Sequence, residues 1–204
     1  MHYSEVPRHP LGLPPGSVRA ILTFQIVGLF WLLLLIPDDR AVPIPLYLYF
    51  LLAMVMIFFV SHGKSIAKKA DASPSPLWMP GGSIRFLLLA GTAAVIAYIG
   101  FSAPDRFSRL DVTPGQLAHW KSYMGALVIG FFVGFAIHVM PFRHSWSYQS
   151  FQAWIAILAM LSMVLDMILQ AFIKTSLTER IGDGFVVWQT IVTAITAFYF
   201  GSRS

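Results

Sequence analysis

The run AILTFQIVGLFWLLLLI, residues 20–36, decides the fold of this chain. It contains no charged residue, and it is longer than the apolar core of about 7–15 residues that secretory signal peptides use. The four residues that follow it, 37–40, read PDDR and offer no small-x-small cleavage site. A bilayer core about 30 Å thick is crossed by about 20 helical residues, with a range of about 17–25. We therefore expect residues 20–36 to form an uncleaved transmembrane helix.

Five further stretches have the same character, so that apolar segments fill most of the 204 residues. The six predicted spans are Arg19–Ile36, Pro45–Ser61, Ile84–Phe101, Ser122–Met140, Gln152–Ile173 and Gly184–Gly201. Hydrophobic residues make up 57% of the chain and charged residues 11%, with a mean hydropathy of +0.70. Soluble domains carry about 25% charged residues. We predict an all-α polytopic membrane protein of six transmembrane helices, with residues 1–204 forming a single membrane domain.

The distribution of basic residues favours one orientation of these spans. An even number of spans places both termini on the same side. If that side is the cytoplasm, the inner segments carry 8 Lys and Arg residues and the outer loops carry 6, in the direction of the positive-inside rule. The net charge of +5 is scattered around the spans, which indicates contact with anionic lipid headgroups rather than with nucleic acid. We expect a protein integral to the cell (cytoplasmic) membrane, with both termini cytoplasmic.

Two segments of the chain are similar at an offset of 66 residues. Residues 10–22 and 76–88 are identical at seven of thirteen positions, and Pro37-Asp38 after the first span recurs as Pro104-Asp105 after the third. Similarity at a fixed period is typical of a repeated structural unit. Here the unit is a two-helix hairpin, whose copies share one orientation, as in some transporters. We predict three hairpins, at approximately 10–75, 76–144 and 145–204, the third of which has diverged.

Each similar segment ends in a Gly-Ser-x-Arg pattern at the start of a span. Ser17 and Ser83 can accept hydrogen bonds from the free N–H groups of the first helical turn. Arg19 and Arg85 can extend to lipid phosphates at the membrane surface. Two interpretations follow. The pattern fixes the depth and orientation of the helix, or it forms a specific site for a phospholipid or phosphate ligand beside free backbone N–H groups.

Small residues identify the helices expected to pack most closely. Association of helices in lipid depends on close backbone approach and on interhelical hydrogen bonds. The fourth span contains Gly130 and Gly134 in a GxxxG pattern, and the third contains four alanines and a glycine between positions 90 and 97. We therefore predict that these two spans form a tightly packed centre. The first two spans, rich in large apolar residues, are expected to face lipid or a partner.

Asp166 is the only ionisable residue predicted to lie well inside a span. Such residues are costly in a bilayer and by default mark a functional site. Ser162 and Gln170 lie on the same helix face as Asp166, and Gln189 and Thr193 follow in the last span. At about 1.5 Å per residue, Asp166 and Gln189 reach the same depth. Three interpretations follow: polar contacts that hold the last two spans together, a proton or cation site, or a contact to a partner subunit.

Known signatures of catalysis are missing from the sequence. There is no cysteine, no HExxH pattern and no Walker-type glycine loop. His138 is predicted to lie about 15 Å from Asp166 in depth, too far for an acid–base pair, and is expected at the membrane interface. We predict no catalytic residues, no metal site and no cofactor, and therefore not an enzyme.

The remaining functions are non-catalytic. We expect a scaffold or accessory subunit of a larger membrane complex, which binds protein partners or forms a homo-oligomer. The alternative is a channel, small transporter or holin-like pore that handles protons or cations through the polar stripe at Asp166.

Overall fold

The computed structural model describes residues 13, 16–38, 41–61, 76–79, 82–140, 146–172 and 176–203, and within them every regular element is a helix. The α-helices are α1 (Ser17–Leu35), α2 (Leu46–Ser61), α3 (Ser83–Ser102), α4 (Pro114–Ala118), α5 (Trp120–Val139), α6 (Trp146–Phe172) and α7 (Ser176–Gly201). Two short 3₁₀ helices accompany them, η4 (Pro76–Trp78) and η5 (Pro104–Leu110).

Five of the described helices are long and apolar enough to cross a membrane, namely α1, α3, α5, α6 and α7. They agree with five of the six predicted spans and indicate a membrane protein. The remaining predicted span, Pro45–Ser61, corresponds to α2, whose apolar part, Leu46–Phe58, is shorter. Residues 41–45, which precede α2, are not helical. Pro43 and Pro45 favour this, because a proline disfavours the helical conformation of the residue before it.

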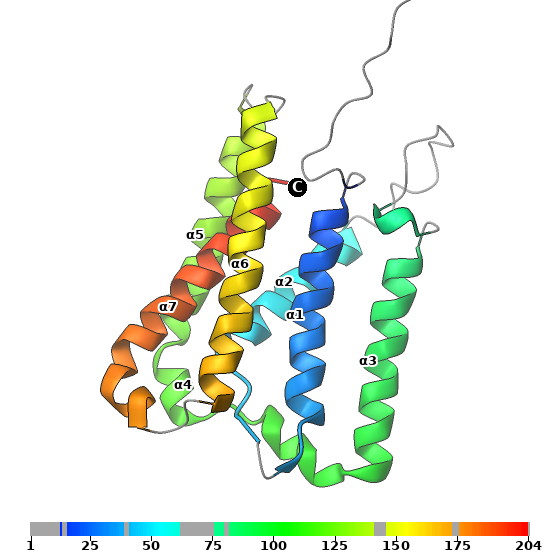
Figure 1. Cartoon of the computed structure of the whole chain (residues 1–204), viewed down its shortest axis with the longest axis vertical. Helices are drawn as coiled ribbons and strands as arrows, with labels where there is room; N and C mark the ends of the chain where they lie inside the picture. The colour runs from blue at the N-terminus through cyan, green and yellow to red at the C-terminus, as the bar shows by residue number, and fades with distance from the viewer. Residues whose placement is uncertain are drawn as a thin grey trace, which may run out of the picture.

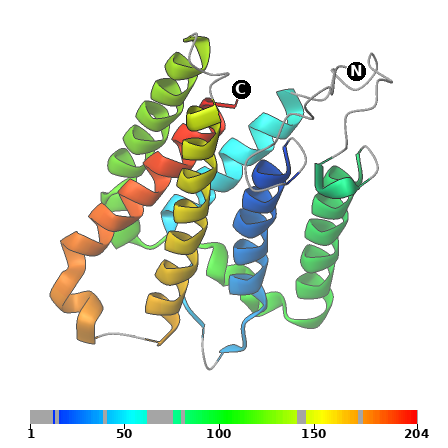
Figure 2. The ribbon, with the colours of Figure 1, turned by 45° about the horizontal axis from the view of Figure 1, so that its top comes forward.

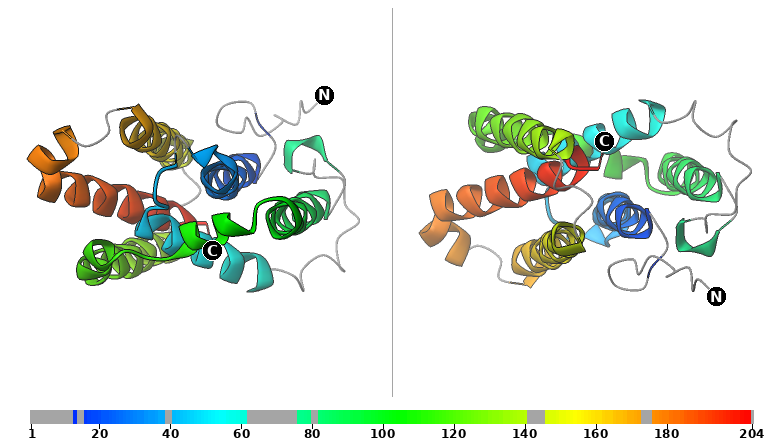
Figure 3. Two further views of the ribbon diagram at one scale, coloured as in Figure 1. Left: turned by 90° about the horizontal axis from the view of Figure 1, so that it is seen from below. Right: turned by 90° about the horizontal axis from the view of Figure 1, so that it is seen from above.

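The long helices run side by side, with α3 at one edge of the molecule and α5 and α7 at the other (Figure 1). Seen along the long axis, α1 lies between α3 and α6 (Figure 3). Helix α2 crosses obliquely behind α1 and α6 (Figure 2). Consequently α2 contacts α1, α5 and α7, and lies near the middle of the bundle.

The buried core comes largely from α1 and α2. Side chains that are at most 1% exposed include Leu22 and Ile26 of α1 and Leu48, Leu51 and Val55 of α2. The prediction that the first two spans face lipid or a partner is therefore wrong for these faces. Leu and Val are as apolar as lipid, so composition alone does not separate a helix buried in a membrane protein from a lipid-facing one.

The predicted tight pair of third and fourth spans is also wrong. Helix α5 packs along α7, and α3 packs along α1. Helix α3 packs on α1 because the Trp31 side chain of α1 fits against Gly91 of α3. A Cβ atom added to Gly91 would lie less than 3.0 Å from atoms of the Trp31 indole. The indole Nε1 of Trp31 also donates a 3.2 Å hydrogen bond to Oγ1 of Thr92. Gly91 therefore makes room for a side chain of α1 and not for a contact with α5.

Left-handed glycines begin both α1 and α3. Gly16 has φ 82° and Gly82 has φ 89°, and neither helix has a side-chain N-cap. The expected caps, Ser17 and Ser83, are instead the first residues of their helices. The two starts thus share one local geometry. Residues 10–12, 14, 15, 80 and 81 of the similar segments lie outside the described residues, and the repeat stays a prediction.

The loop between α3 and α5 is helical and closes the end of the bundle where α1 ends. Arg109 of η5 donates to the carbonyl oxygens of Leu33 (3.3 Å), Leu34 (3.2 Å) and Ile36 (2.6 Å), and forms an ion pair with Asp38. The last carbonyls of a helix have no partner within it. A basic side chain is well placed there, because the helix dipole is negative at this end.

A candidate functional site around Asp166

Asp166 lies on α6 with only 1% of its surface exposed. Its carboxylate accepts hydrogen bonds from three side chains on three helices. The hydroxyl of Tyr47 donates to Oδ2 at 2.8 Å, and Nε2 of Gln170 donates to Oδ2 at 2.7 Å. Nε2 of Gln189 lies 3.4 Å from Oδ1 and 3.5 Å from Oδ2. A carboxylate has only acceptors, so this set of donors matches its ionised form.

A second tyrosine extends the network to a fourth helix. Tyr123 of α5, which is 3% exposed, donates a 2.8 Å hydrogen bond to Oε1 of Gln189. The rings of Tyr123 and Tyr47 lie 6.5 Å apart. Gln189 thus accepts through its oxygen and donates through its nitrogen. The network, which we call the Asp166 cluster, consists of Tyr47, Tyr123, Asp166, Gln170 and Gln189, and joins α2, α5, α6 and α7.

The cluster brings together part of the stripe expected from the sequence. Asp166, Gln170 and Gln189 meet, and the hydrogen bond across the last two spans is present. Ser162 is half-buried one turn earlier and is not among the described donors to Asp166. Thr193 is fully buried, but its hydroxyl donates to the Gln189 carbonyl in its own helix, at 2.7 Å.

Sequence reasoning missed the two tyrosines of the cluster. Tyr47 lies on α2, which was expected to face outward, and Tyr123 lies near the start of α5, where tyrosines commonly mark the membrane interface. A usable signal was the polar tip of each ring, because a tyrosine hydroxyl usually has a hydrogen-bond partner when it is buried. The carboxylate of Asp166 has only acceptor atoms, so it was a suitable partner for a tyrosine hydroxyl.

Glycines hold α5 and α7 in backbone contact beside the cluster. A Cβ added to Gly130 would overlap the Ala194 carbonyl oxygen, and one added to Gly134 would overlap the Phe198 carbonyl oxygen. Across the same interface, a Cβ at Gly201 would overlap the Phe131 carbonyl oxygen. All three contacts fall below 3.0 Å, which real Cβ atoms essentially never show. The GxxxG pattern of α5 therefore faces α7 rather than α3.

The side chains of the first serine–arginine pair, Ser17 and Arg19, contact other groups of the protein. Ser17 is fully buried, and its Oγ accepts a 2.8 Å hydrogen bond from the backbone N–H of Leu77. The guanidinium of Arg19 lies 4.9 Å above the Phe58 ring and donates to the Arg203 carbonyl at 3.4 Å. Arg19 thus links α1 to α2 and to the turn that follows α7.

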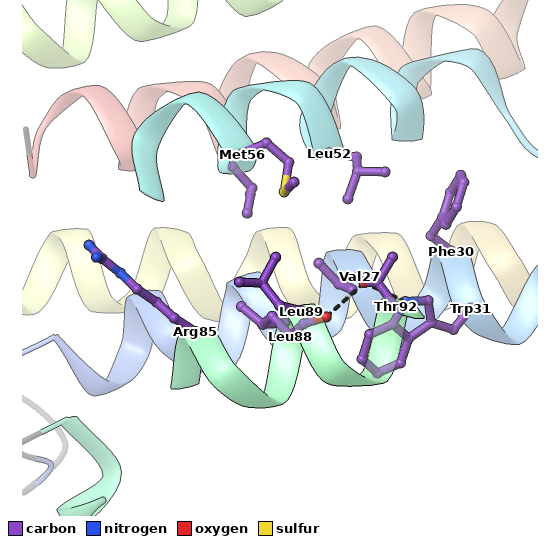
Figure 4. A pocket seen from close by; sticks show the side chains of 10 residues that line it. Val27, Phe30, Trp31, Leu52, Met56, Arg85, Leu88, Leu89 and Thr92 are labelled. Carbon is purple, nitrogen blue, oxygen red and sulfur yellow. Dashed lines mark hydrogen bonds between the residues drawn. The ribbon is translucent and has the colours of Figure 1, made fainter. Parts of the chain in front are cut away.

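The second pair lies in a different setting. Ser83 is half-buried at the first position of α3. Arg85 is also half-buried and stands at one end of a cavity between α1, α2 and α3 (Figure 4). The two pairs, similar in sequence, therefore differ in one respect: Arg85 lines a cavity, whereas Arg19 lies over the Phe58 ring.

The turn after α7 is fixed by polar contacts from two other helices. Nδ1 of His138 on α5 donates to the Ser202 carbonyl at 3.1 Å, because a carbonyl oxygen only accepts. Nε2 of Gln152 on α6 donates to the same oxygen at 3.2 Å. His138 thus has a structural partner at this end of the bundle, far along α5 from the Asp166 cluster.

No family model, curated protein or solved structure matches this chain. Within the described residues, no three His, Asp or Glu side chains come together in a group able to hold a metal ion.

Proposed function

We propose that this chain is a non-catalytic scaffold or accessory subunit of a larger membrane complex, and that it binds a partner helix through α3. The observation that carries the proposal is the outward face of this helix. Only Leu88 and Ile99 of α3 are buried. The opposite side presents four exposed small residues in its middle, Ala90, Ala93, Ala94 and Ala97, with the exposed rings of Phe86 and Phe101 above and below them. At 3.6 residues per turn these four alanines share one face.

Small residues on an outward face favour a helix partner over lipid. Large side chains fill the space next to lipid tails, whereas small residues let two helix backbones approach closely. The α5–α7 interface follows this rule within the same molecule, where Gly130 and Gly134 contact the backbone at Ala194 and Phe198. The alanine face of α3 offers a comparable surface, and its four alanines are exposed among the residues that the structure describes.

The Asp166 cluster supports a structural role for the one intramembrane acid. Its carboxylate already has three donors, and the groups that supply them come from α2, α6 and α7. Hydrogen bonds between membrane helices contribute about 0.6 kcal/mol on average and at most about 1.7 kcal/mol. Several such bonds at one crossing favour a single arrangement of four helices. A rigid bundle of this kind suits a subunit that presents one helix to a partner.

The topology belongs to the same proposal. We infer six crossings, with α2 and the non-helical residues 41–45 together forming the second, and three hairpins that repeat in parallel. Both termini lie in the cytoplasm, and the membrane is the cell membrane, as the excess of basic residues in the inner segments favours. Accessibility of tags fused to the two ends, measured in intact and in permeabilised cells, tests this orientation. Tags on opposite sides would contradict it.

Site-directed cross-linking tests the α3 surface. The chain has no cysteine, so a single introduced cysteine carries a photoactivated cross-linker at one known position. Ala93→Cys and Ala97→Cys are expected to yield adducts of higher mass in native membranes. Leu161→Cys on α6, whose native side chain is 62% exposed, is the matched control for an exposed apolar site. Adducts from the control at the same yield, or no adducts from α3, would overturn the proposal. Adducts of twice the chain mass would make the partner a second copy.

The alternative function is the handling of protons or cations through Asp166. The observation that favours it is the burial of a single acid within the membrane bundle, which by default marks a functional group. Proton and cation flux into liposomes that contain wild-type protein or Asp166→Asn decides between the two. A subunit with a structural cluster gives no flux above empty liposomes in either case. Flux that requires Asp166 would establish the alternative instead.

A further inference from the structure

A cavity of about 360 Å³ lies between α1, α2 and α3. Its walls are apolar side chains, among them Val27 of α1, Leu52 and Val55 of α2, and Leu88 and Leu89 of α3. The volume falls in the range of about 300–1,000 Å³ that ligand sites occupy. Figure 4 shows these side chains facing one another across the space, with Leu52 and Met56 on one side and the α3 residues on the other.

Among the described residues that line the cavity, those between its two ends are apolar except for Thr92. Thr92 lines it, but its hydroxyl donates to the Leu88 carbonyl at 2.7 Å and accepts from Trp31 at 3.2 Å. The hydrogen bond from Trp31 to Thr92 also uses the only donor of the Trp31 side chain, its indole N–H. A ligand inside the cavity must therefore be apolar along its body, because a buried polar atom without a partner is costly.

The two ends of the cavity differ in character. Phe30 and Trp31 lie at one end, and Arg85 lies at the other (Figure 4). Arg85 is in the first turn of α3, the end of the helix where the dipole is positive and where no side chain caps the backbone N–H groups. One end thus carries positive charge and the rest is apolar. This arrangement complements an anionic amphiphile.

The cavity opens sideways toward the region of the lipid tails. Met56 of α2 is 51% exposed and Leu89 of α3 is 63% exposed, and both line it. A ligand can therefore enter between α2 and α3 from the bilayer. Because Arg85 is near the start of a membrane-length helix, its charge lies at headgroup depth while the Trp31 end lies deeper.

We propose that this cavity binds one acyl chain of an anionic phospholipid, with the lipid phosphate at Arg85. The apolar walls select the chain, and the guanidinium, which pairs readily with phosphate oxygens, selects the headgroup. The site does not depend on the partner helix proposed for α3. The cavity uses the flank of α3 that carries Arg85, Leu88, Leu89 and Thr92, whereas the alanine face lies on the other side of the helix.

Photoactivatable lipids test the site directly. Protein in nanodiscs is given phosphatidylglycerol or phosphatidylcholine that carries a diazirine in one acyl chain, and the modified residues are mapped by mass spectrometry. Phosphatidylglycerol is expected to label the cavity walls, and phosphatidylcholine to label them about fivefold less, the effect of about one basic residue near the surface. Equal labelling by the two lipids, or labelling only of outward faces, would overturn the proposal.

Two substitutions and a matched control separate the parts of the site. Arg85→Gln is expected to abolish the preference for phosphatidylglycerol, and Arg85→Lys to retain most of it. Arg203→Gln removes one positive charge at the same end of the bundle but away from the cavity, and should leave the preference unchanged. Val55→Phe fills the cavity and should reduce labelling by both lipids, with circular dichroism checking that the protein is folded. If Arg85→Gln kept the full preference, the assignment of the phosphate to Arg85 would be wrong.

Discussion

The hydroxyl of Tyr47 donates a 2.8 Å hydrogen bond to Oδ2 of Asp166, across 119 positions of the chain. This bond ties the start of α2 to the last third of α6. Most other contacts of α2 are apolar, and lipid tails can replace such contacts at little cost, because the hydrophobic effect does not drive helices together in a bilayer.

Tyr47→Phe removes this hydrogen bond and little volume. We expect the free energy of unfolding to fall by about 0.6–1.7 kcal/mol, the range for hydrogen bonds between membrane helices. The measurement is unfolding in mixed micelles with increasing SDS, followed by far-ultraviolet circular dichroism. Tyr98→Phe on α3, where the ring is 51% exposed, is the control and should leave the midpoint unchanged. Equal midpoints for Tyr47→Phe and wild type would show that the bond adds nothing to stability.

Gly130→Ala and Gly134→Ala place a methyl group against backbone carbonyls of α7 that cannot rotate away. Overpacking of this kind costs about 1–3 kcal/mol, since the helices must separate. The same SDS titration measures the loss. Gly125→Ala on the same helix is the matched control, because nothing lies within 4 Å of its Cβ position, and it should be neutral or slightly stabilising. A loss as large at Gly125 as at Gly130 would refute the interface argument.

Gly82→Ala tests the left-handed start of α3 without any steric clash. A Cβ at Gly82 meets nothing within 4 Å, so the cost comes only from φ 89°. A left-handed conformation costs an ordinary residue about 1–2 kcal/mol, and asparagine tolerates it better. We therefore expect the order of stability Gly, then Asn, then Ala at this position. The opposite order for Asn and Ala, in the same titration, would rule out the conformational explanation.

Arg109→Gln tests the cap on α1. The guanidinium satisfies three carbonyls and is buried, with 8% of its side chain exposed, so its loss leaves buried acceptors unpaired at a cost of about 1–3 kcal/mol. Its ionic partner Asp38 is 78% exposed, and exposed ion pairs contribute about 0–1 kcal/mol. Asp38→Asn should therefore be much milder than Arg109→Gln in the unfolding titration. Similar losses would mean that the ion pair, and not the capping, stabilises this end.

The sequence was a good guide to where the long apolar helices lie. Long apolar runs have few alternatives in a bilayer, because every backbone group must be hydrogen-bonded. Counting residues from the helix ends was enough to place Asp166 beside Gln189, because both lie on regular helices. These inferences use only local geometry, which depends little on which helices are neighbours.

The choice of neighbours was the part that could not be predicted. Glycines occur in several spans, and composition does not say which pair will meet. The structure uses Gly91 for the Trp31 indole, and Gly130 for the backbone of α7. Both choices depend on the shapes of two surfaces at once. The role of Tyr47 could not be predicted for the same reason. Its hydroxyl points to a hydrogen bond with Asp166 only when the two helices are known to be neighbours.

The contacts of Arg19 have a consequence for how the protein is made. This side chain binds the Arg203 carbonyl, 184 positions later, and Tyr47 binds Asp166, 119 positions later. Helices α1 and α2 therefore leave the ribosome long before these two partners have been synthesised. Until α6 and α7 follow, α1 has only its earlier partners, among them Thr92 of α3 and Arg109 of η5. The contacts of Tyr47 and Arg19 thus form last, after α6 and the turn that follows α7 have been synthesised.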